Sequence, residues 1–369
     1  MAGSAVPPAS TAVAPRRAVF RRLTVAAVDR LCADACAVTF DVPDGLAEEF
    51  AFRPGQYLTL RRHVGSVEER RSYSICAPAG GPLRIGVRLV PDGLFSAWLT
   101  SQVRPGEEVD VLPPQGSFTP ELDLPAHHCL IAAGSGITPV LSIATSALAA
   151  DPATRVTLLY GNRRTDTVMF ADDLAELKDT YPARLQLVHV LSREPREIDL
   201  FSGRLDAARL SALLSAVVPW SRVDHWWLCG PFGMIQDARS VLASFAVPPD
   251  RVHAELFYVD EPPPELVRAE PPLTTDGATS EVTVILDGRS TTLDLPRSTP
   301  ILDAAQRVRA DLPFACKGGV CGTCRAKVVT GEVHMRRNFA LEQAELDAGF
   351  ALTCQALPLT DTVTVDYDT

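Results

Sequence analysis

Short runs of alternating apolar and polar residues, broken by Gly and Pro, occupy residues 20 to 120. A period of two is the pattern of a β-strand that buries one face, so this third of the chain is predicted to be an all-β domain. The stretch LRIGVRLVPDGLFSAWL adds a strand, a turn at Asp92-Gly93 and the start of a helix that carries Ser96.

The middle third has a different pattern, in which apolar runs end in polar or glycine-rich turns and are separated by segments of helical period. These runs are LIAAGSGITPV, LLYGNRR, LVHVLSRE and HWWLCGP. Alternation of this kind predicts a parallel sheet with crossover helices, in which ligands gather at the carboxyl ends of the strands. We therefore expect an α/β domain over residues 125–259.

The last third returns to short strands. EVTVILDG and STTLDL are alternating runs joined through Asp287-Gly288, which predicts a hairpin. AKVV, the amphipathic run LEQAELDAG and the strand TVTVDY follow. We expect a small α+β domain over residues 277–369. Its first helix, in TPILDAAQRVRA, is predicted to place four residues on one face: Ile301, Leu302, Ala305 and Val308.

Two segments lack apolar periodicity. The Pro-rich stretch over residues 260–276 predicts an extended linker, and residues 1–19 predict a disordered tail. The tail lacks the basic region and apolar core of a secretory signal, which favours a cytoplasmic protein. No apolar run approaches the length of a membrane span, so no membrane partner is expected. The formal net charge of -10 argues against a nucleic-acid partner, because phosphate binding needs clustered Lys and Arg.

The chain has 9 cysteines and no export signal, so ligands are more plausible than a disulfide framework. Four of them follow the C-x4-C-x2-C…C spacing of plant-type [2Fe-2S] ferredoxins. Zinc is the alternative, although zinc sites usually need a second C-x2-C pair that is missing here. Glycines among them suit a tight loop whose amides face sulfur. The expected ligands are Cys316, Cys321, Cys324 and Cys354.

The element order around these cysteines resembles the β-grasp fold of plant-type ferredoxins. Upstream, RRSYSIC follows PGQYLTL and precedes a strand-Gly-x-x-Ser-helix unit, and this set resembles the FAD-binding barrel of the ferredoxin-NADP reductase superfamily. The resemblance implies that Arg71 pairs with the flavin pyrophosphate, Tyr73 packs on the isoalloxazine ring and Ser74 hydrogen-bonds near flavin N5. The other FAD contacts expected are Tyr57, Val87, Gly93, Leu94, Phe95 and Ser96.

GSGITP and Cys229-Gly230-Pro231 resemble the nicotinamide half of the same superfamily, and imply a dinucleotide site. Thr138 is expected to cap the helix after the first loop, and Pro139 to take the first helical position. Cys229 is expected to lie beside the nicotinamide as a positional residue, and with Ser74 it is our candidate catalytic residue. The remaining nucleotide contacts expected are Gly134, Ser135, Gly136, Thr138, Pro139, Asn162, Arg163, Gly230 and Pro231.

The choice between the two nicotinamide nucleotides is expected to depend on the turn after LVHVL. Ser192 and Arg193 offer a hydroxyl and a fixed cation that suit the 2′-phosphate of NADPH. Glu194 follows directly and keeps NADH open as an alternative, since a carboxylate could accept from a ribose hydroxyl.

The order of flavin barrel, nicotinamide domain and ferredoxin resembles the reductase components of bacterial multicomponent oxygenases. CKGGVCGTCRAKVVTGEV…LTCQA most resembles the reductase subunits of phenylacetyl-CoA 1,2-epoxidases, from phenylacetate catabolism. The resemblance implies electron transfer from NADPH through FAD and [2Fe-2S] to diiron oxygenase subunits. Two alternatives remain: the reductase of a ketosteroid or aromatic-ring hydroxylase, and a non-catalytic redox sensor that binds nucleotide and zinc.

Three further residue pairs carry predictions. His127-His128 precede an apolar strand and are expected in a solvated turn, whereas Trp226-Trp227 are expected to pack in a core. Glu255 and Phe257 match the place where related reductases bring a residue near the flavin.

Overall fold

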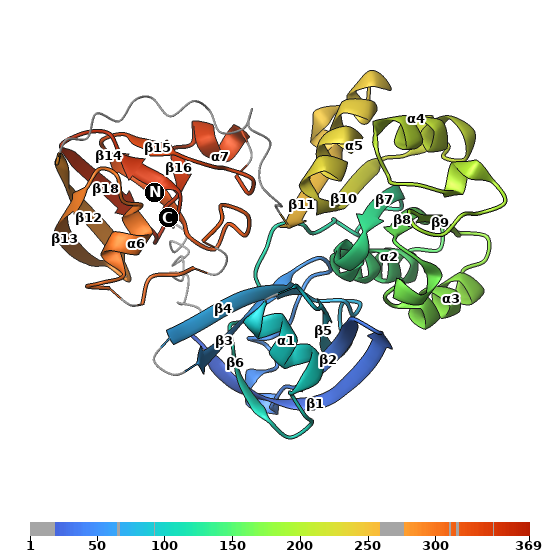
Figure 1. The fold of residues 1–369 in the computed structure, drawn as a ribbon, viewed down its shortest axis with the longest axis horizontal. Helices are drawn as coiled ribbons and strands as arrows, with labels where there is room; N and C mark the ends of the chain where they lie inside the picture. Colours follow the sequence, from blue (N-terminus) through green and yellow to red (C-terminus); the bar gives the residue numbers. More distant parts are fainter. Residues whose placement is uncertain are drawn as a thin grey trace, which may run out of the picture.

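The computed structural model describes residues 19–64, 67–91, 93–258, 277–309, 311–314, 317–341 and 343–369. Residues 1–18 of the predicted tail, the whole predicted linker and the predicted ligand Cys316 lie outside the described residues. The described parts form three bodies, blue, green to yellow, and orange to red in Figure 1. The predicted multidomain architecture, with an antiparallel sheet, a parallel sheet in an α/β domain and a small α+β domain, is confirmed.

The first body is a closed antiparallel sheet. Its strand order is β4-β3-β6-β1-β2-β5, and a bridge between Ile75 and Ile85 joins its two ends. The helix α1 begins after Gly93, as the sequence predicts. The elements are β1 (Arg21–Cys32), β2 (Ala35–Asp41), η1 (Asp44–Leu46), β3 (Tyr57–Val64), β4 (Val67–Ser74), β5 (Leu83–Arg88), α1 (Leu94–Ser101) and β6 (Glu108–Val111).

The strand β5 shows how alternation builds both the barrel and its contact with the second body. Leu83, Ile85 and Val87 point into the barrel core. The intervening Arg84 and Gly86 face the nucleotide domain, where the Arg84 guanidinium lies 2.9 Å from an Asp173 carboxylate oxygen. The alternation of side chains along β5 therefore places one set in the barrel core and the other against the nucleotide domain.

The second body is a parallel sheet with helices on both faces, in the order β11-β10-β7-β8-β9. Residues of α2 and α3 pack on one face and those of α4 and α5 on the other. Its main elements are β7 (His127–Ala133), α2 (Ile137–Ala150), β8 (Arg155–Asn162), α3 (Ala171–Thr180), β9 (Leu185–Leu191), α4 (Ala207–Ala216), β10 (His225–Pro231), α5 (Phe232–Ser244) and β11 (Val252–Tyr258). Short 3-10 turns occupy η2 (Gly134–Gly136), η3 (Thr165–Thr167), η4 (Asp199–Phe201), η5 (Trp220–Arg222) and η6 (Pro249–Arg251).

The third body is a mixed sheet in the order β13-β12-β18-β14-β16, with a small pair β15-β17 beside it. The predicted hairpin is confirmed: Asp287 and Gly288 both have positive φ, 54° and 66°, as a tight two-residue turn requires. The elements are β12 (Thr279–Leu286), β13 (Arg289–Pro296), α6 (Ile301–Ala305), β14 (Arg325–Thr330), β15 (Val333–Met335), α7 (Gln343–Asp347), β16 (Phe350–Leu352), β17 (Ala356–Pro358) and β18 (Thr362–Asp366).

Two sequence expectations were wrong. Val308 is 58% exposed, because α6 ends at Ala305 and the chain then leaves the helical period. His128 is 1% exposed, since β7 already begins at His127, and its ring accepts a hydrogen bond from the Trp227 indole at 3.2 Å. The predicted packing of the tryptophan pair is confirmed by the burial of both rings.

The barrel and the nucleotide domain share a hydrophobic core. Ala35, Ala37, Cys76 and Phe118 of the first body belong to the same cluster as the buried face of α2. At Gly86 the approach is close enough that a Cβ would lie 2.4 Å from Thr138 Cγ2 and 2.8 Å from Phe170 Cζ. The absence of a side chain there allows the two domains to pack together.

We expect Gly86→Ala to destabilise the protein by about 1–3 kcal/mol, because the new methyl group forces the two domains apart. Thermal and urea unfolding measure the loss. Gly45→Ala is the matched control, since a Cβ at Gly45 meets nothing within 4 Å. Equal stability of the two variants would contradict this account of the interface.

Candidate functional site

All three bodies line one cleft of about 2190 Å³. A pocket for one small ligand is usually about 300–1000 Å³, so this volume suits more than one cofactor. The predicted site residues that line it are Tyr57, Arg71, Tyr73, Ser74, Gly93, Phe95, Ser96, Gly134, Ser135, Asn162, Arg163, Ser192, Arg193, Gly230, Pro231 and Cys321.

Other predicted residues do not reach the cleft wall. Val87 is buried in the barrel core and Leu94 is 63% exposed. The buried predicted residues that do not line the cleft are Gly136, Thr138, Pro139, Cys229, Cys324 and Cys354.

The strand β4 presents the predicted flavin contacts. Arg71 is exposed beside the cleft, and its Nη1 donates to the Arg70 carbonyl at 2.7 Å. The Tyr73 ring lies 6.0 Å from the Phe95 ring, centroid to centroid, at 46°. The buried Ser74 hydroxyl donates across the cleft to Glu255 Oε2 at 3.4 Å. Alternation along β4 thus sends Ser74 toward the nucleotide domain and Tyr73 toward the barrel core.

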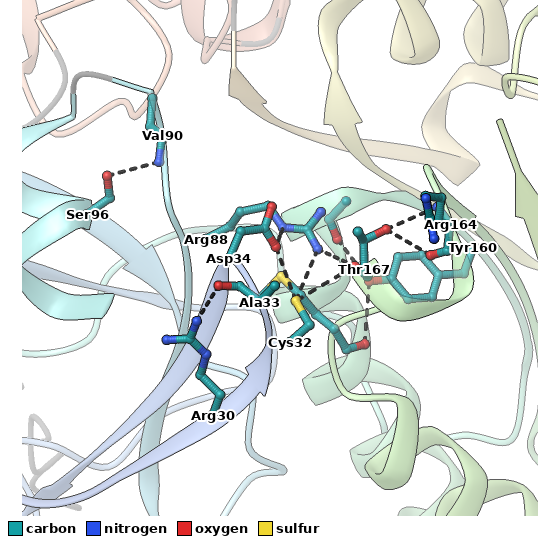
Figure 2. A network of polar contacts seen from close by, with 12 residues as sticks. Arg30, Cys32, Ala33, Asp34, Arg88, Val90, Ser96, Tyr160, Arg164 and Thr167 are labelled. Atoms are coloured by element: carbon teal, nitrogen blue, oxygen red, sulfur yellow. Dashed lines mark hydrogen bonds and ion pairs between the residues drawn. The ribbon is translucent and has the colours of Figure 1, made fainter. Parts of the chain in front are cut away.

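The loop before α1 is held tightly by its own atoms. Ser96 Oγ accepts from the Val90 amide and donates to the Gly93 carbonyl, each at 3.1 Å, and Figure 2 draws the first of these bonds. A Cβ at Gly93 would lie 2.7 Å from Ser96 Oγ, so glycine permits this turn. The first-turn amides of α1 stand beside the cleft wall, where they suit an anion such as a pyrophosphate. Asp92 lies outside the described residues.

The first nucleotide loop is the 3-10 turn η2 between β7 and α2. Gly134 has φ 57°, and its carbonyl accepts from the Tyr160 hydroxyl at 3.1 Å. A Cβ at Gly136 would lie 2.1 Å from the Cys229 carbonyl oxygen, so the two nucleotide loops touch through their backbones. The loop leads into the N-terminus of α2, which favours anions.

The cap expected at this helix is wrong. Because η2 runs directly into α2, the residue at the N-cap is Gly136, and Ile137 is the first helical residue. Thr138 is inside the first turn and donates to the Ser135 carbonyl at 2.9 Å. Pro139 is consequently the third helical residue.

The second nucleotide loop ends β10. Cys229 is fully buried and pairs in register with Glu255 on β11. Burial raises the pKa of the Cys229 thiol well above its ordinary value, and the nearby Glu255 adds to the effect. A neutral thiol is a poor nucleophile, which agrees with a positional role.

Glu255 is half-buried in the cleft wall. Desolvation raises the pKa of its carboxyl to about 8, opposed by the hydrogen bond from Ser74. The carboxyl is therefore mostly protonated near neutral pH, next to the Ser74 hydroxyl. Phe257, the other residue of this pair, packs against the core shared by the barrel and the nucleotide domain.

The ends of β8 and β9 gather cations. The Ser192 amide donates to the Asn162 carbonyl at 2.9 Å, and the Arg193 amide donates to the Arg163 carbonyl at 2.8 Å. The Glu194 carboxylate accepts from the Thr165 amide at 2.8 Å and from its hydroxyl at 2.7 Å. These bonds lower the pKa of Glu194 and hold its carboxylate on the η3 turn.

Sequence reasoning missed several arginines of the cleft wall, among them Arg88 and Arg204. Arg88 ends β5, and its Nη1 would lie 3.3 Å from a Cβ at Gly134. Figure 2 shows its guanidinium between Asp34, Cys32 and the Thr167 carbonyl. The barrel thereby brings a cation to the nucleotide loop. Continued alternation after Arg84 and Gly86 is the signal that could have found it.

The cysteine loop winds through left-handed backbone positions. Lys317, Gly319 and Gly322 have φ values of 52°, 78° and 68°. Gln355 Nε2 donates to the Lys317 carbonyl at 2.8 Å and approaches Cys354 Sγ at 3.6 Å. Among the described residues no three His, Cys, Asp or Glu side chains converge on a single metal ion.

The chemistry of the loop nevertheless fits a cluster. Cys324 and Cys354 are buried and hydrogen-bonded to each other through their thiols, and Cys321 is partly exposed beside the cleft. Three soft sulfur donors on a glycine-rich loop, with an amide directed at one sulfur, match what a [2Fe-2S] cluster requires.

In the described part of the chain, no helix is both long and apolar enough to traverse a lipid bilayer.

Three family comparisons agree with the three bodies. Residues 22–119 match the oxidoreductase FAD-binding domain, residues 130–240 the oxidoreductase NAD-binding domain and residues 284–359 the 2Fe-2S iron-sulfur cluster binding domain. These matches establish FAD, a pyridine nucleotide and a [2Fe-2S] cluster as the cofactors of this oxidoreductase.

Two relatives match nearly the whole chain. One of the subunits of 1,2-phenylacetyl-CoA epoxidase from Escherichia coli (strain K12) is 42% identical over 95% of this chain and 98% of its own. The ferredoxin reductase component of 3-ketosteroid-9-alpha-monooxygenase from Rhodococcus rhodochrous is 36% identical over 94% of this chain and 96% of its own.

Solved structures share the fold. Phthalate dioxygenase reductase aligns with a TM-score of 0.59 and 23% identity over 94% of this chain and 98% of its own. An intact type IV self-sufficient cytochrome P450 monooxygenase aligns with a TM-score of 0.67 and 19% identity, over 94% of this chain and 41% of its own. With its three cofactor-binding domains and its whole-length relatives, the chain belongs to the family of flavin and iron-sulfur oxygenase reductases that contains this 1,2-phenylacetyl-CoA epoxidase component.

Proposed function

We propose that this protein is a cytoplasmic NADPH-dependent reductase that passes electrons through FAD and [2Fe-2S] to the diiron oxygenase subunits of a phenylacetyl-CoA epoxidase. The single observation that carries the proposal is the shared cleft, which brings the β4 strand, both nucleotide loops and the cysteine loop to one space. The whole-length similarity to the 1,2-phenylacetyl-CoA epoxidase component supports the choice of partner. A ketosteroid monooxygenase reductase is the second candidate, supported by the 36% identity to that component.

The side chains have positioning roles in this proposal. When bound, FAD would supply the conversion of the two-electron hydride of NADPH into single electrons, and a [2Fe-2S] cluster would supply one-electron transfer. Within the proposed FAD domain, residues 20–124, Arg71 and the α1 amides hold the flavin pyrophosphate. Within the proposed nucleotide domain, residues 125–259, the η2 turn holds the NADPH pyrophosphate with help from Arg88. Residues 277–369 form the proposed ferredoxin domain.

The position of Glu194 supports NADPH over NADH. A carboxylate that accepts two hydrogen bonds from Thr165 is turned away from a ribose hydroxyl. Ser192 and Arg193 line the cleft at the same turn, with Arg163 beside them. A cation and a hydroxyl suit a 2′-phosphate, because charge-assisted hydrogen bonds are the stronger ones.

Ser74 and Glu255 form a hydrogen-bonded pair that can hold a proton where the flavin edge is expected. Because Glu255 is mostly protonated near pH 7, its carboxyl holds a proton while one of its oxygens accepts from the Ser74 hydroxyl. Such a pair is a reservoir for proton movement that accompanies electron transfer.

Arg193→Ala should raise the KM for NADPH tenfold or more and leave the KM for NADH nearly unchanged, since it removes a contact of about 1.5–3 kcal/mol that only the 2′-phosphate makes. Steady-state reduction of an artificial acceptor measures both constants. Arg196→Ala is the control, because Arg196 is exposed and does not line the cleft. Equal losses with the two nucleotides would reject this site.

Glu255→Gln should change how stability depends on pH. Folding raises the pKa of the Glu255 carboxyl from 4.5 to about 8. The protonated carboxyl therefore favours the folded state fully below the unfolded pKa, and this contribution to the free energy of unfolding is lost as pH rises toward 8. Between pH 5 and 8 the parent should lose stability relative to the variant, by at most about 1.4 kcal/mol per pH unit. Thermal unfolding at several pH values checks this. The exposed Glu48→Gln variant should follow the parent, and parallel curves for Glu255→Gln would refute the raised pKa.

Cys321→Ser should abolish or severely destabilise the cluster, because a hard hydroxyl replaces a soft thiolate. FAD should still be reduced by NADPH, while delivery to the oxygenase subunits should collapse. Absorbance and paramagnetic resonance measure the cluster, and coupled oxygenation measures delivery. Cys32→Ser, in the barrel, should keep the full cluster content. Delivery at the parental rate in Cys321→Ser would show that the cluster is not the relay.

A further inference from the structure

The flavin barrel contacts the cysteine loop through a tyrosine. The Tyr57 hydroxyl donates to the Cys321 carbonyl at 3.0 Å and lies 3.2 Å from the Thr323 hydroxyl. These residues are more than 260 positions apart and belong to different domains. The contact therefore forms only when the ferredoxin domain lies against the barrel. It involves the backbone carbonyl of Cys321, which is an expected cluster ligand.

Tyr57 is itself rigidly held. It is 8% exposed, and its amide and carbonyl bond to Gln115 at 2.8 and 2.9 Å. A Cβ at Gly116 would lie 3.1 Å from the ring, so glycine makes room for it. Directly opposite Tyr57 in the β3–β4 register is Ser74. One residue thus connects the strand pair that carries the flavin contacts to the cysteine loop.

An arginine makes a second contact on the other flank of the loop. Arg70 is 6% exposed, and its guanidinium carbon lies 4.3 Å from the centroid of the Phe314 ring. Its Nη1 donates to the Leu312 carbonyl at 3.5 Å, and Glu68 pairs with it at 2.6 Å. A planar cation is suited to stacking and hydrogen bonding at the same time. Figure 1 shows β4, which carries Arg70, at the side of the barrel that faces the ferredoxin domain.

We propose that Tyr57 and Arg70 form a docking pair that seats the cysteine loop against the flavin barrel for electron transfer between the two cofactors. The inference rests on the proposed reductase function. Both are positioning residues: the rate of electron transfer falls steeply with distance, and the pair fixes that distance. Phe232 of the nucleotide domain adds an edge-on contact with Phe339 of the ferredoxin domain at 5.3 Å. The seat therefore involves all three domains.

The test removes each end of one contact. Tyr57→Phe and Thr323→Val are made singly and together, and Tyr181→Phe, on the far side of α3, is the control for loss of a tyrosine hydroxyl. NADPH is mixed rapidly with the full holoprotein, and the rate of cluster reduction is divided by the rate of flavin reduction recorded in the same trace. We expect this ratio to fall about threefold to tenfold in Tyr57→Phe, the loss that one hydrogen bond of ordinary net strength allows.

The double variant decides whether the two hydroxyls act together. We expect it to be no slower than the worse single variant, because both substitutions break the same contact. Multiplied effects would show that the two hydroxyls act independently, which would overturn the contact between Tyr57 and Thr323 as part of the docking. Arg70→Lys keeps the charge beside Glu68 and loses the planar stack on Phe314, so it should lower the same ratio although no residue of the cysteine loop is substituted. An unchanged ratio in both Tyr57→Phe and Arg70→Lys would overturn the docking pair.

A second readout does not depend on turnover. In the oxidised holoprotein without nucleotide, amide hydrogen exchange over residues 317–324 should be about threefold to tenfold faster in Tyr57→Phe and Arg70→Lys than in the parent, and unchanged in Tyr181→Phe. Equal amide exchange in the parent and in all three variants would contradict the proposed docking pair. A parent that fails to reduce its flavin with NADPH rejects the proposed function instead, so the two failures are distinguishable.

Discussion

The close packing of β5 against α2 is the constraint on which the cleft depends. Gly86 lets a barrel strand approach Thr138 and Phe170, and the arginines two positions before and after it, Arg84 and Arg88, reach across the same boundary. Because the two domains share one hydrophobic core there, the wall that holds flavin contacts and the wall that holds nucleotide loops keep a fixed spacing. A hydride can pass only between rings near contact, so the spacing itself is part of the chemistry.

Between these two walls lies a pair of uncharged side chains. Cys229 and Glu255 pair across neighbouring strands, and burial keeps both protonated at neutral pH. The cleft wall also carries cations, among them Arg71 on β4, Arg88 at the end of β5 and Arg193 after β9. In the proposed function these cations suit the phosphates of the nucleotides, and the neutral pair suits a transfer of hydride between two neutral ring systems.

Local patterns predicted much of this arrangement. The alternating runs predicted the all-β first domain, and the cysteine spacing predicted the iron-sulfur domain that the family match confirms. Errors came where a neighbouring element decided the outcome. The η2 turn moved the helix start ahead of Thr138, and the early end of α6 exposed Val308.

The contacts that no local pattern could reveal are those between domains. A single strand gives no sign that Tyr57 would meet Cys321, because the partner lies on another domain. The sequence marks such residues only as polar positions on an otherwise apolar face. Three-dimensional contact is what separates them from ordinary surface side chains.

The two domain interfaces differ in kind, and the difference suits an electron carrier. The barrel and the nucleotide domain are joined by shared apolar core residues, which makes their union durable. The ferredoxin domain is held by a hydroxyl, a stacked guanidinium and partly buried Val320 and Phe339. Polar interfaces of modest extent between domains usually permit relative motion. The cysteine loop lines the cleft in this arrangement, and release of so modest a docking contact would expose it to an external acceptor.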